Sequence, residues 1–152
     1  QNFGAKKIKR VKKAYQTATV LMLIWGALCT LALTLLPSPL FQIFIREEEV
    51  LPMGVSYLQI LGLSQLFMCI EASSTGAFNG LGETRIPSVV SVVFNLARIP
   101  MALILSSTSL GLDGIWWALS ISSICKGIVL TIGYFLYIRK RHLLETVPEG
   151  NA

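Results

Sequence analysis

The chain has 152 residues, of which 53% are hydrophobic and 14% charged, and its mean hydropathy is +0.65. This balance excludes a disordered chain, and the long apolar runs are typical of a membrane protein rather than a water-soluble domain. The net charge is +5, but six of the thirteen Lys and Arg residues lie within residues 6–13, so the positive charge is local. Three cysteines lie singly inside apolar runs beside a single histidine elsewhere, which argues against a zinc site and a disulfide framework.

Four segments are long enough to cross a bilayer, which needs roughly 20 apolar helical residues. They lie at about residues 15–36, 50–79, 87–105 and 114–138. The first ends at Pro37, because proline removes a backbone donor and excludes further helix, and the third is interrupted by Asn95, Arg98 and Pro100. The sequence therefore predicts an all-α, polytopic membrane protein with four transmembrane helices, preceded by a basic segment (1–14) and followed by a tail (139–152).

Basic residues are concentrated on one side of these spans. Ten of the thirteen Lys and Arg residues lie in residues 1–14, 80–86 and 139–152, whereas the opposite side carries Arg46 beside three glutamates. Because short loops rich in Lys and Arg stay in the cytoplasm, we expect a multi-pass protein of the plasma (inner) membrane with both ends of this chain cytoplasmic. The basic run at 6–13 lies at the edge of a span, where anionic membrane lipids explain it better than a nucleic-acid partner.

Three charged residues lie inside the predicted spans, namely Glu71, Arg98 and Lys126. Each charge costs about 2.5 to 3.5 kcal/mol on insertion scales, so each requires a function or a partner. In the functional interpretation, Glu71 lies in a solvated cavity and binds a proton or a sodium ion during transport. In the structural interpretation, Glu71 neutralises Arg98 or Lys126 as an ion pair. The pattern leaves both interpretations open.

Polar residues at helical spacing surround these charges on the second, third and fourth spans. Such stripes are typical of the walls of a polar cavity rather than of a surface that faces lipid. The residues that we expect to line this cavity are Ser64, Thr75, Asn79, Ser91, Asn95, Arg98 and Lys126.

Gly76 and Gly80 form a GxxxG step, and Gly82 follows them. Because this step lets the backbone of a neighbouring helix approach, the three glycines are predicted to pack helices together. A phosphate cradle is disfavoured, since no strand precedes the glycines and no Lys-Ser/Thr pair follows them. The sequence contains no Ser-His-Asp, Cys-His or paired-carboxylate constellation, so neither an enzyme nor a cofactor other than a coupling ion is expected.

Several motifs, in order, resemble those of the multidrug and toxic compound extrusion (MATE) transporters. Residues 1–7 resemble the QNxGAxx stretch that opens a cytoplasmic loop, and residues 76–87 resemble the G-x-x-x-G-x-G-[DE]-T-x-x-P loop. Residues 98–100 and 111–116 resemble the RIP and GLxGxW elements. The resemblance covers about residues 1–140.

Members of this family have twelve helices in two similar bundles of six. The resemblance implies that this chain is a C-terminal fragment, corresponding to the last four helices of the second bundle, whose partners include the missing N-terminal bundle. It implies an antiporter that exports small amphipathic organic compounds in exchange for protons or sodium by alternating access. It also implies that Glu71 is the cation-coupling residue, because several members use acidic side chains inside the second bundle.

Two other functions stay open. A lipid-linked oligosaccharide flippase of the same superfamily would have a more cationic cavity, which Arg98 and Lys126 favour. A membrane scaffold that does not transport would use the GxxxG surface to bind other helices and would tolerate Glu71→Gln.

Overall fold

The computed structural model of the chain describes residues 2–5 and 7–146. These residues form five helices and no strand, and four of the helices are long and apolar enough to cross a membrane. The helices are α1 (Ile8–Leu35), the short α2 (Pro37–Gln42), α3 (Leu51–Gly80), α4 (Arg85–Ser106) and α5 (Leu112–Thr146). The predicted fold class, an all-α membrane protein with four spans, is therefore confirmed.

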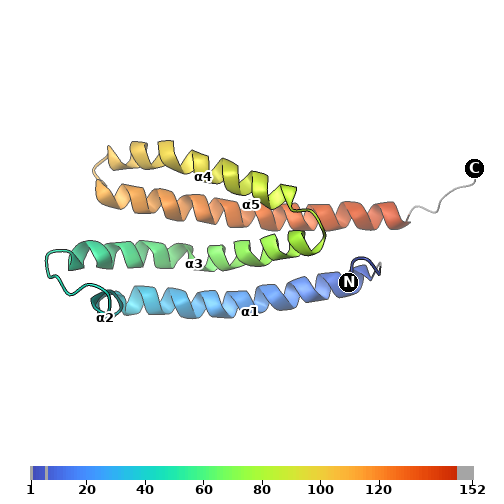
Figure 1. Ribbon diagram of the computed structural model, residues 1–152, viewed down its shortest axis with the longest axis horizontal. Helices are drawn as coiled ribbons and strands as arrows, with labels where there is room; N and C mark the ends of the chain where they lie inside the picture. The colour runs from blue at the N-terminus through green and yellow to red at the C-terminus, as the bar shows by residue number, and fades with distance from the viewer. Residues whose placement is uncertain (1, 6, 147–152) are drawn as a thin grey trace, which may run out of the picture.

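The four long helices lie side by side in a single layer, in the order α1, α3, α5, α4 (Figure 1). The chain order differs from this spatial order, because α4 packs on α5 and barely contacts α3, which precedes it in the sequence. The start of α1 and the end of α5 lie at the same end of the layer (Figure 1), which we call the basic end because Lys and Arg residues of these two helix ends gather there. Which side of the membrane this end faces stays a prediction.

The first and last helices extend beyond the spans expected from the sequence. Helix α1 begins at Ile8 instead of residue 15, so half of the basic segment is helical, and α5 continues beyond residue 138 to Thr146. Helix α1 ends just before Pro37, as predicted, but Pro37 also begins α2. The reason is that the fixed φ of proline suits the first turn of a helix, where its missing N–H would have no partner.

Glycines bring the helices of the layer into close contact. A Cβ atom added at Gly62 would lie 3.0 Å from the methyl carbon of Thr34, and the Thr30 hydroxyl donates a hydrogen bond to the Gly62 carbonyl at 2.9 Å, so α1 and α3 meet here. A Cβ atom at Gly127 of α5 would lie 2.7 Å from the carbonyl oxygen of Phe67 on α3. In a membrane the hydrophobic effect does not drive helices together, so their association depends on close packing. Small residues such as these glycines let the helix backbones approach closely enough for it.

The glycines expected to pack helices make no such contact. At Gly76, Gly80 and Gly82, an added Cβ atom would meet nothing within 4 Å among the described residues. Gly76 and Gly80 line an open groove between α1 and α3, and Gly82, with φ of +79°, occupies the turn between α3 and α4. The described helices therefore do not pack through these glycines, and their role in helix packing stays a prediction; the turn at Gly82 uses the left-handed conformation that glycine permits.

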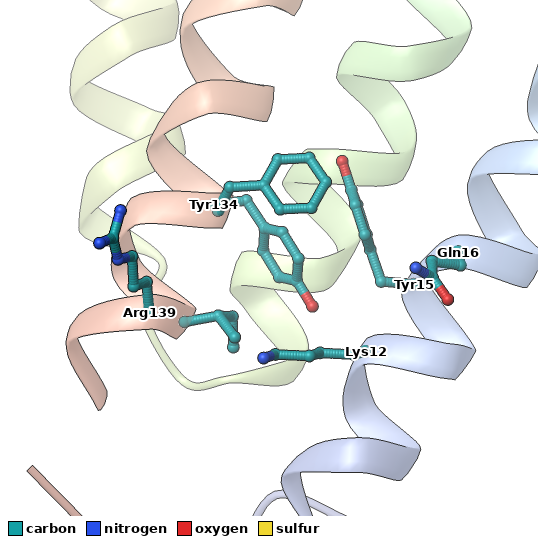
Figure 2. A pocket seen from close by; sticks show the side chains of 7 residues that line it. Lys12, Tyr15, Gln16, Tyr134 and Arg139 are labelled. Carbon is teal, nitrogen blue, oxygen red and sulfur yellow. The ribbon is translucent and has the colours of Figure 1, made fainter. Parts of the chain in front are cut away.

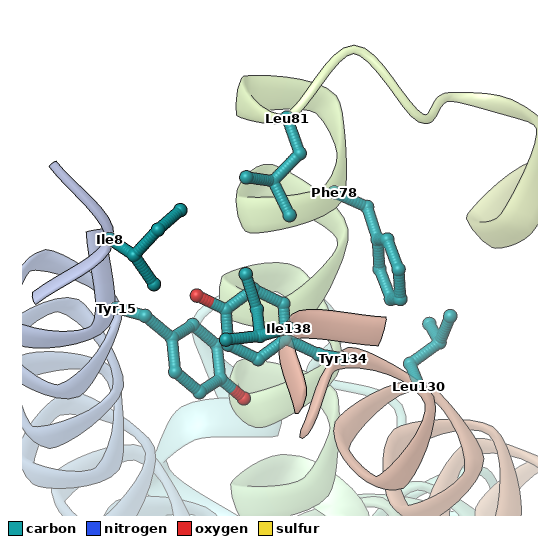
Figure 3. Packing of buried hydrophobic residues seen from close by; sticks show 7 residues of the cluster. All are labelled: Ile8, Tyr15, Phe78, Leu81, Leu130, Tyr134 and Ile138. Atoms are coloured by element: carbon teal, nitrogen blue, oxygen red, sulfur yellow. The ribbon is translucent and has the colours of Figure 1, made fainter. Parts of the chain in front are cut away.

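The largest buried apolar cluster lies at the basic end. Tyr15 of α1 and Tyr134 of α5 face each other with ring centroids 3.9 Å apart (Figure 2), and Phe78 of α3 meets Tyr134 edge-on at 5.9 Å. We call this cluster the basic-end core; Figure 3 shows its members, which are Ile8, Tyr15, Phe78, Leu81, Leu130, Tyr134 and Ile138. It joins α1, α3 and α5 into one packed unit.

Hydroxyl groups connect the same three helices beside this core. The Ser74 hydroxyl of α3 is hydrogen-bonded to the Tyr15 hydroxyl at 3.0 Å and to the Thr131 hydroxyl at 3.2 Å. Thr131 also donates to the Gly127 carbonyl in the preceding turn of α5. These three hydroxyls therefore all have partners, which matters in a medium without water.

Candidate functional site

A pocket of about 310 Å³ brings together all three charged residues of the predicted spans. We call it the charged pocket. It is formed by α3, α4 and α5, and its walls combine charged, amide, hydroxyl and apolar side chains. The lining residues are Tyr57, Leu61, Met68, Glu71, Ala72, Asn95, Arg98, Leu119, Ser123 and Lys126.

Glu71 and Lys126 form an ion pair across this pocket. The Lys126 Nζ and Glu71 Oε1 atoms are 2.8 Å apart, and the two side chains are 11% and 19% exposed, respectively. The pair joins α3 to α5, the two central helices of the layer. Among the described residues Glu71 makes no ion pair with Arg98, so of the two structural pairings considered, the one with Lys126 forms.

Arg98 is the second cation of the pocket and is incompletely satisfied. Its Nη2 donates to the Ser123 hydroxyl at 3.4 Å, while its Nε is buried without a hydrogen-bond partner among the described residues. A buried donor without a partner costs about 1 to 3 kcal/mol, and more when the group is charged. The pocket thus contains two cations, one carboxylate and a free donor, and is formally charged +1.

The other walls of the pocket are aromatic and aliphatic. The ring of Tyr57 on α3 meets that of Trp116 on α5 edge-on, with centroids 5.6 Å apart. Leu61, Met68 and Leu119 complete these walls, and Met side chains adapt readily to different shapes. The pocket therefore offers both an electrostatic and an apolar surface to a ligand.

The structure brings together only some of the residues predicted to line the cavity. Asn95 lines the charged pocket beside Glu71, Arg98 and Lys126, whereas four others do not. Those four are Ser64, Thr75, Asn79 and Ser91. These four residues therefore lie outside the charged pocket, and their role in lining a cavity stays a prediction.

Distance and rotation along the helices explain this outcome. Ser64 is fully buried and donates to the Leu61 carbonyl within α3, so its hydroxyl is satisfied locally. Asn79 is exposed and follows Glu71 by eight residues, or about 12 Å at 1.5 Å per residue toward the basic end, whereas the pocket extends from Glu71 in the opposite direction, as far as Tyr57. Ser91 precedes Arg98 by seven residues, about 10 Å. Helical spacing fixes the face of a residue but not its depth in the membrane.

The apolar and aromatic walls of the pocket were not among the predicted lining residues. Tyr57, Leu61 and Met68 precede Glu71 by 14, 10 and 3 residues, which places all three on its side of α3. This spacing was a usable signal, although the predicted lining rested on polar residues alone. Ser123, one turn before Lys126, is a further lining residue. Among the described residues, no group of three His, Cys, Asp or Glu side chains is arranged to hold a metal ion.

A layer of four membrane-crossing helices with charged side chains between them defines a multi-pass membrane protein with a polar interior site. Residues 1–104, more than half of the chain, match the sequence model of the MatE family. The chain therefore belongs to the MatE family, as its motifs indicated. This is a family of transporters rather than enzymes, in agreement with the expectation from the sequence.

Individual members show the same relationship. The chain is 29% identical to the probable multidrug resistance protein NorM of Thermotoga maritima over 99 residues, which cover 64% of this chain and 21% of that protein. It is 26% identical to the probable multidrug resistance protein YoeA of Bacillus subtilis over 146 residues, 93% of this chain and 31% of YoeA. Against human multidrug and toxin extrusion protein 1 the identity is 18% over 137 residues, 89% and 24% of the two chains. The chain thus spans a fifth to a third of the length of these relatives.

Proposed function

We propose that this chain forms part of an antiporter that exports amphipathic organic compounds in exchange for protons or sodium ions, with Glu71 as the residue that binds the coupling cation. The names of the relatives support drug export as the activity. The observation that carries the role of Glu71 is its ion pair with Lys126, inside a pocket shared by three helices. The remaining helices, including an N-terminal bundle, are proposed to come from the rest of a longer protein.

Because the ion pair joins α3 to α5, binding of the coupling cation to Glu71 would change the contact between these two helices. Two opposite charges 2.8 Å apart and mostly removed from water attract each other strongly, so they hold α3 to α5. A proton or a sodium ion on Glu71 replaces Lys126 as the neutralising charge. Cation binding would therefore weaken the contact between the two central helices and favour a second arrangement of the bundle.

The charge of the pocket makes the coupling cation and a cationic substrate compete. The pocket is formally +1 with Glu71 ionised, and +2 once Glu71 has bound a monovalent cation. The added charge disfavours an organic cation nearby, which is the mutual exclusion that antiport requires. At about 310 Å³ the pocket is at the small end for a drug-sized ligand, so we place the substrate in the cavity between the two bundles expected for the family.

The proposed location is the plasma (inner) membrane, with the basic end in the cytoplasm. The clustering of Lys and Arg at one end of the layer supports this orientation, because basic loops are retained on the cytoplasmic side. Cysteine accessibility from either side, probed at an introduced residue of the Arg46–Glu49 loop, tests it. Labelling from outside intact cells is expected.

Drug efflux from cells that lack their own exporters tests the role of Glu71. The full-length protein is compared with Glu71→Gln, Lys126→Gln and the double variant that carries both changes. We expect Glu71→Gln and the double variant to lose efflux driven by a proton or sodium gradient. The double variant leaves no unpaired charge at this pair, so its membrane abundance should exceed that of Lys126→Gln. Glu83→Gln, which changes a carboxylate at the α3–α4 turn that accepts a hydrogen bond from Tyr137, is the matched control.

Two results would contradict the proposal. Efflux by the double variant at the wild-type rate would show that the ion pair is only structural. Wild-type efflux no higher than that of cells without the protein would favour the scaffold interpretation, in which the described helices bind other helices and transport nothing.

A flippase for lipid-linked oligosaccharides is a second candidate, because the charged pocket has an excess of positive charge and a free donor on Arg98. These features suit the phosphate groups of an anionic lipid carrier. Arg98→Gln separates the candidates. It is expected to abolish flipping of a diphosphate-linked lipid in vesicles if the protein is a flippase, and to leave drug efflux within about threefold of wild type if the protein is a drug exporter.

A further inference from the structure

A second pocket, which shares no lining residue with the charged pocket, lies at the basic end between α1 and α5 (Figure 2). Its volume is about 370 Å³, and we call it the basic-end pocket. Lys12 and Gln16 contribute from α1, and Phe135 and Arg139 from α5, while the stacked rings of Tyr15 and Tyr134 form its floor. No lining residue is acidic, so both charged groups at the pocket are cations.

The hydroxyl of Tyr134 is the feature that points to a ligand. The side chain is 1% exposed, yet its hydroxyl oxygen has no hydrogen-bond partner among the described residues. The neighbouring Tyr15 differs, because its hydroxyl is bonded to Ser74. Figure 2 shows the Tyr134 hydroxyl directed toward the Lys12 side chain rather than toward the Tyr15 hydroxyl. The pocket therefore places a buried hydroxyl, which can both donate and accept a hydrogen bond, near the Lys12 cation.

The pocket lies at the level where an apolar span meets its basic flank. Lys12 and Lys13 are the last charged residues before the apolar part of α1, and Arg139 is the first after the apolar part of α5. This is the depth at which phospholipid phosphate groups lie. From here the exposed side chains of Phe135 and Ile132, 56% and 54% exposed, lead along α5 into the membrane.

We propose that the basic-end pocket binds the phosphate headgroup of an anionic phospholipid from the adjacent leaflet. The phosphate accepts hydrogen bonds from the Tyr134 hydroxyl, the Lys12 amine and the Arg139 guanidinium, and an acyl chain lies along Ile132 and Phe135. The aromatic and aliphatic walls favour a lipid over a free phosphate ion. The acyl chain of a lipid can pack against these walls, whereas a phosphate ion offers them no apolar surface. The inference goes beyond the proposed function and depends only on the placement of these helices in a membrane.

Photocrosslinking tests the proposal on the full-length protein reconstituted in phosphatidylcholine vesicles. The probe is phosphatidylglycerol with a diazirine in its acyl chain, at a trace fraction of the lipid. The readout is the yield of crosslinks that map to residues 128–139 of α5. Unlabelled phosphatidylglycerol should compete for these crosslinks, whereas equal amounts of phosphatidylcholine and millimolar inorganic phosphate should not.

A matched pair of variants separates the pocket from general surface charge. Lys12→Gln with Arg139→Gln should reduce the crosslinking yield about tenfold or more, since both cations contact the phosphate. Lys9→Gln with Lys140→Gln removes the same charge from exposed positions outside the pocket and should reduce the yield by less than about threefold. Tyr134→Phe keeps the ring and its packing, and should reduce the yield about threefold to tenfold through loss of the hydroxyl alone.

Each contrary result has a distinct meaning. Equal losses in the two double variants would show attraction by net charge only and would overturn the pocket. Competition by inorganic phosphate would overturn the lipid as ligand, because a free anion would then fill the same site. Crosslinks that do not map to α5, with the variants still eluting as a single folded species, would also overturn the proposal. Since the readout is lipid binding and not transport, its failure is separate from a failure of the antiporter proposal.

Discussion

The basic-end core and the charged pocket lie on the same two central helices but bury polar groups in different ways. At and beside the basic-end core, neutral hydroxyls on α1, α3 and α5 are hydrogen-bonded to one another through Ser74, while the Tyr134 hydroxyl lacks a partner among the described residues. In the charged pocket, Glu71 and Lys126 neutralise each other, while Arg98 keeps a donor without a partner among the described residues. Each region keeps one such polar group, but the first holds neutral hydroxyls and the second holds three charged side chains.

This difference separates a site that holds helices together from a site that can change state. Neutral hydroxyls that are hydrogen-bonded to each other do not bind a proton or a sodium ion at this site. Cation binding therefore leaves their hydrogen bonds unchanged, and the core has one stable arrangement. The ion pair can exchange one of its members for a soluble cation, which gives α3 and α5 a second arrangement. Substitutions in the core should therefore alter stability alone, whereas substitutions in the pocket should alter stability and coupling separately.

The largest loss of stability is expected for Phe78→Ala in the basic-end core. Phe78 is completely buried among rings from α5. Because the unfolded helices stay in an apolar micelle, the loss comes from packing and a cavity rather than from transfer to water, and we expect about 2 to 3 kcal/mol. Unfolding in dodecyl sulfate mixed micelles measures it. Phe44→Ala, at a residue that is 85% exposed, is the control and should change stability little. An equal loss in both variants would contradict the assignment of the core.

The next largest effect is expected for Lys126→Gln, which leaves the Glu71 carboxylate unpaired. Breaking a buried ion pair on one side costs about 3 to 5 kcal/mol, and the partial exposure of this pair reduces our expectation to about 2 kcal/mol. Adding Glu71→Gln should recover most of that loss, because two neutral amides have no charge to leave uncompensated. The same unfolding measurement on both single variants and the double variant gives the coupling energy. A double variant that is as unstable as the two losses added together would show that the pair does not act as a unit.

The sequence was a reliable guide to the spans, because the bilayer imposes a length and a composition on each one. It was less informative about neighbours in space. Residues 80–86 connect two consecutive spans, which suggests that α3 and α4 are a packed hairpin, yet α4 packs on α5. The three charged residues of the spans, Glu71, Arg98 and Lys126, line one pocket, as the sequence predicted. The pairing of Glu71 with Lys126 was not predictable, because it depends on α3 and α5 being neighbours in space.

Two physical reasons explain why some predicted residues lie away from the pocket or from helix contacts. A polar side chain can satisfy itself within its own helix, as Ser64 does, and then it needs no cavity. A GxxxG step permits a neighbouring helix to approach closely, but it does not show that such a helix is present. Among the described residues, close approaches occur at other glycines, including Gly62 and Gly127. The walls formed by Tyr57 and Met68 were readable from their spacing to Glu71. The pairing of helices was not, because no local pattern specifies it.

A smaller effect is expected for Ser74→Ala, which removes the hydroxyl between Tyr15 and Thr131. Hydrogen bonds between membrane helices average about 0.6 kcal/mol, so the loss of two should cost about 1 kcal/mol. Ser88→Ala removes an exposed hydroxyl that donates only to the Thr84 carbonyl in the preceding turn, and it should cost less than about 0.5 kcal/mol. Transport should be unchanged in both variants once it is normalised to membrane abundance. A loss of coupling in Ser74→Ala alone would show that the core, too, changes state during transport.

The smallest effect, and the one whose sign is informative, is expected for Gly76→Ala. The added methyl group meets nothing within 4 Å among the described residues, and alanine favours the interior of a helix over glycine by about 1 kcal/mol in peptides. We therefore expect stability unchanged or raised by about 0.5 kcal/mol in the full-length protein. Gly127→Ala is the matched control and should be destabilising, because its methyl group would lie 2.7 Å from the Phe67 carbonyl oxygen. If Gly76→Ala instead lowers stability as much as Gly127→Ala does, the α3 surface at Gly76 must be in close contact with another helix, and the groove between α1 and α3 is then a helix interface rather than an open surface.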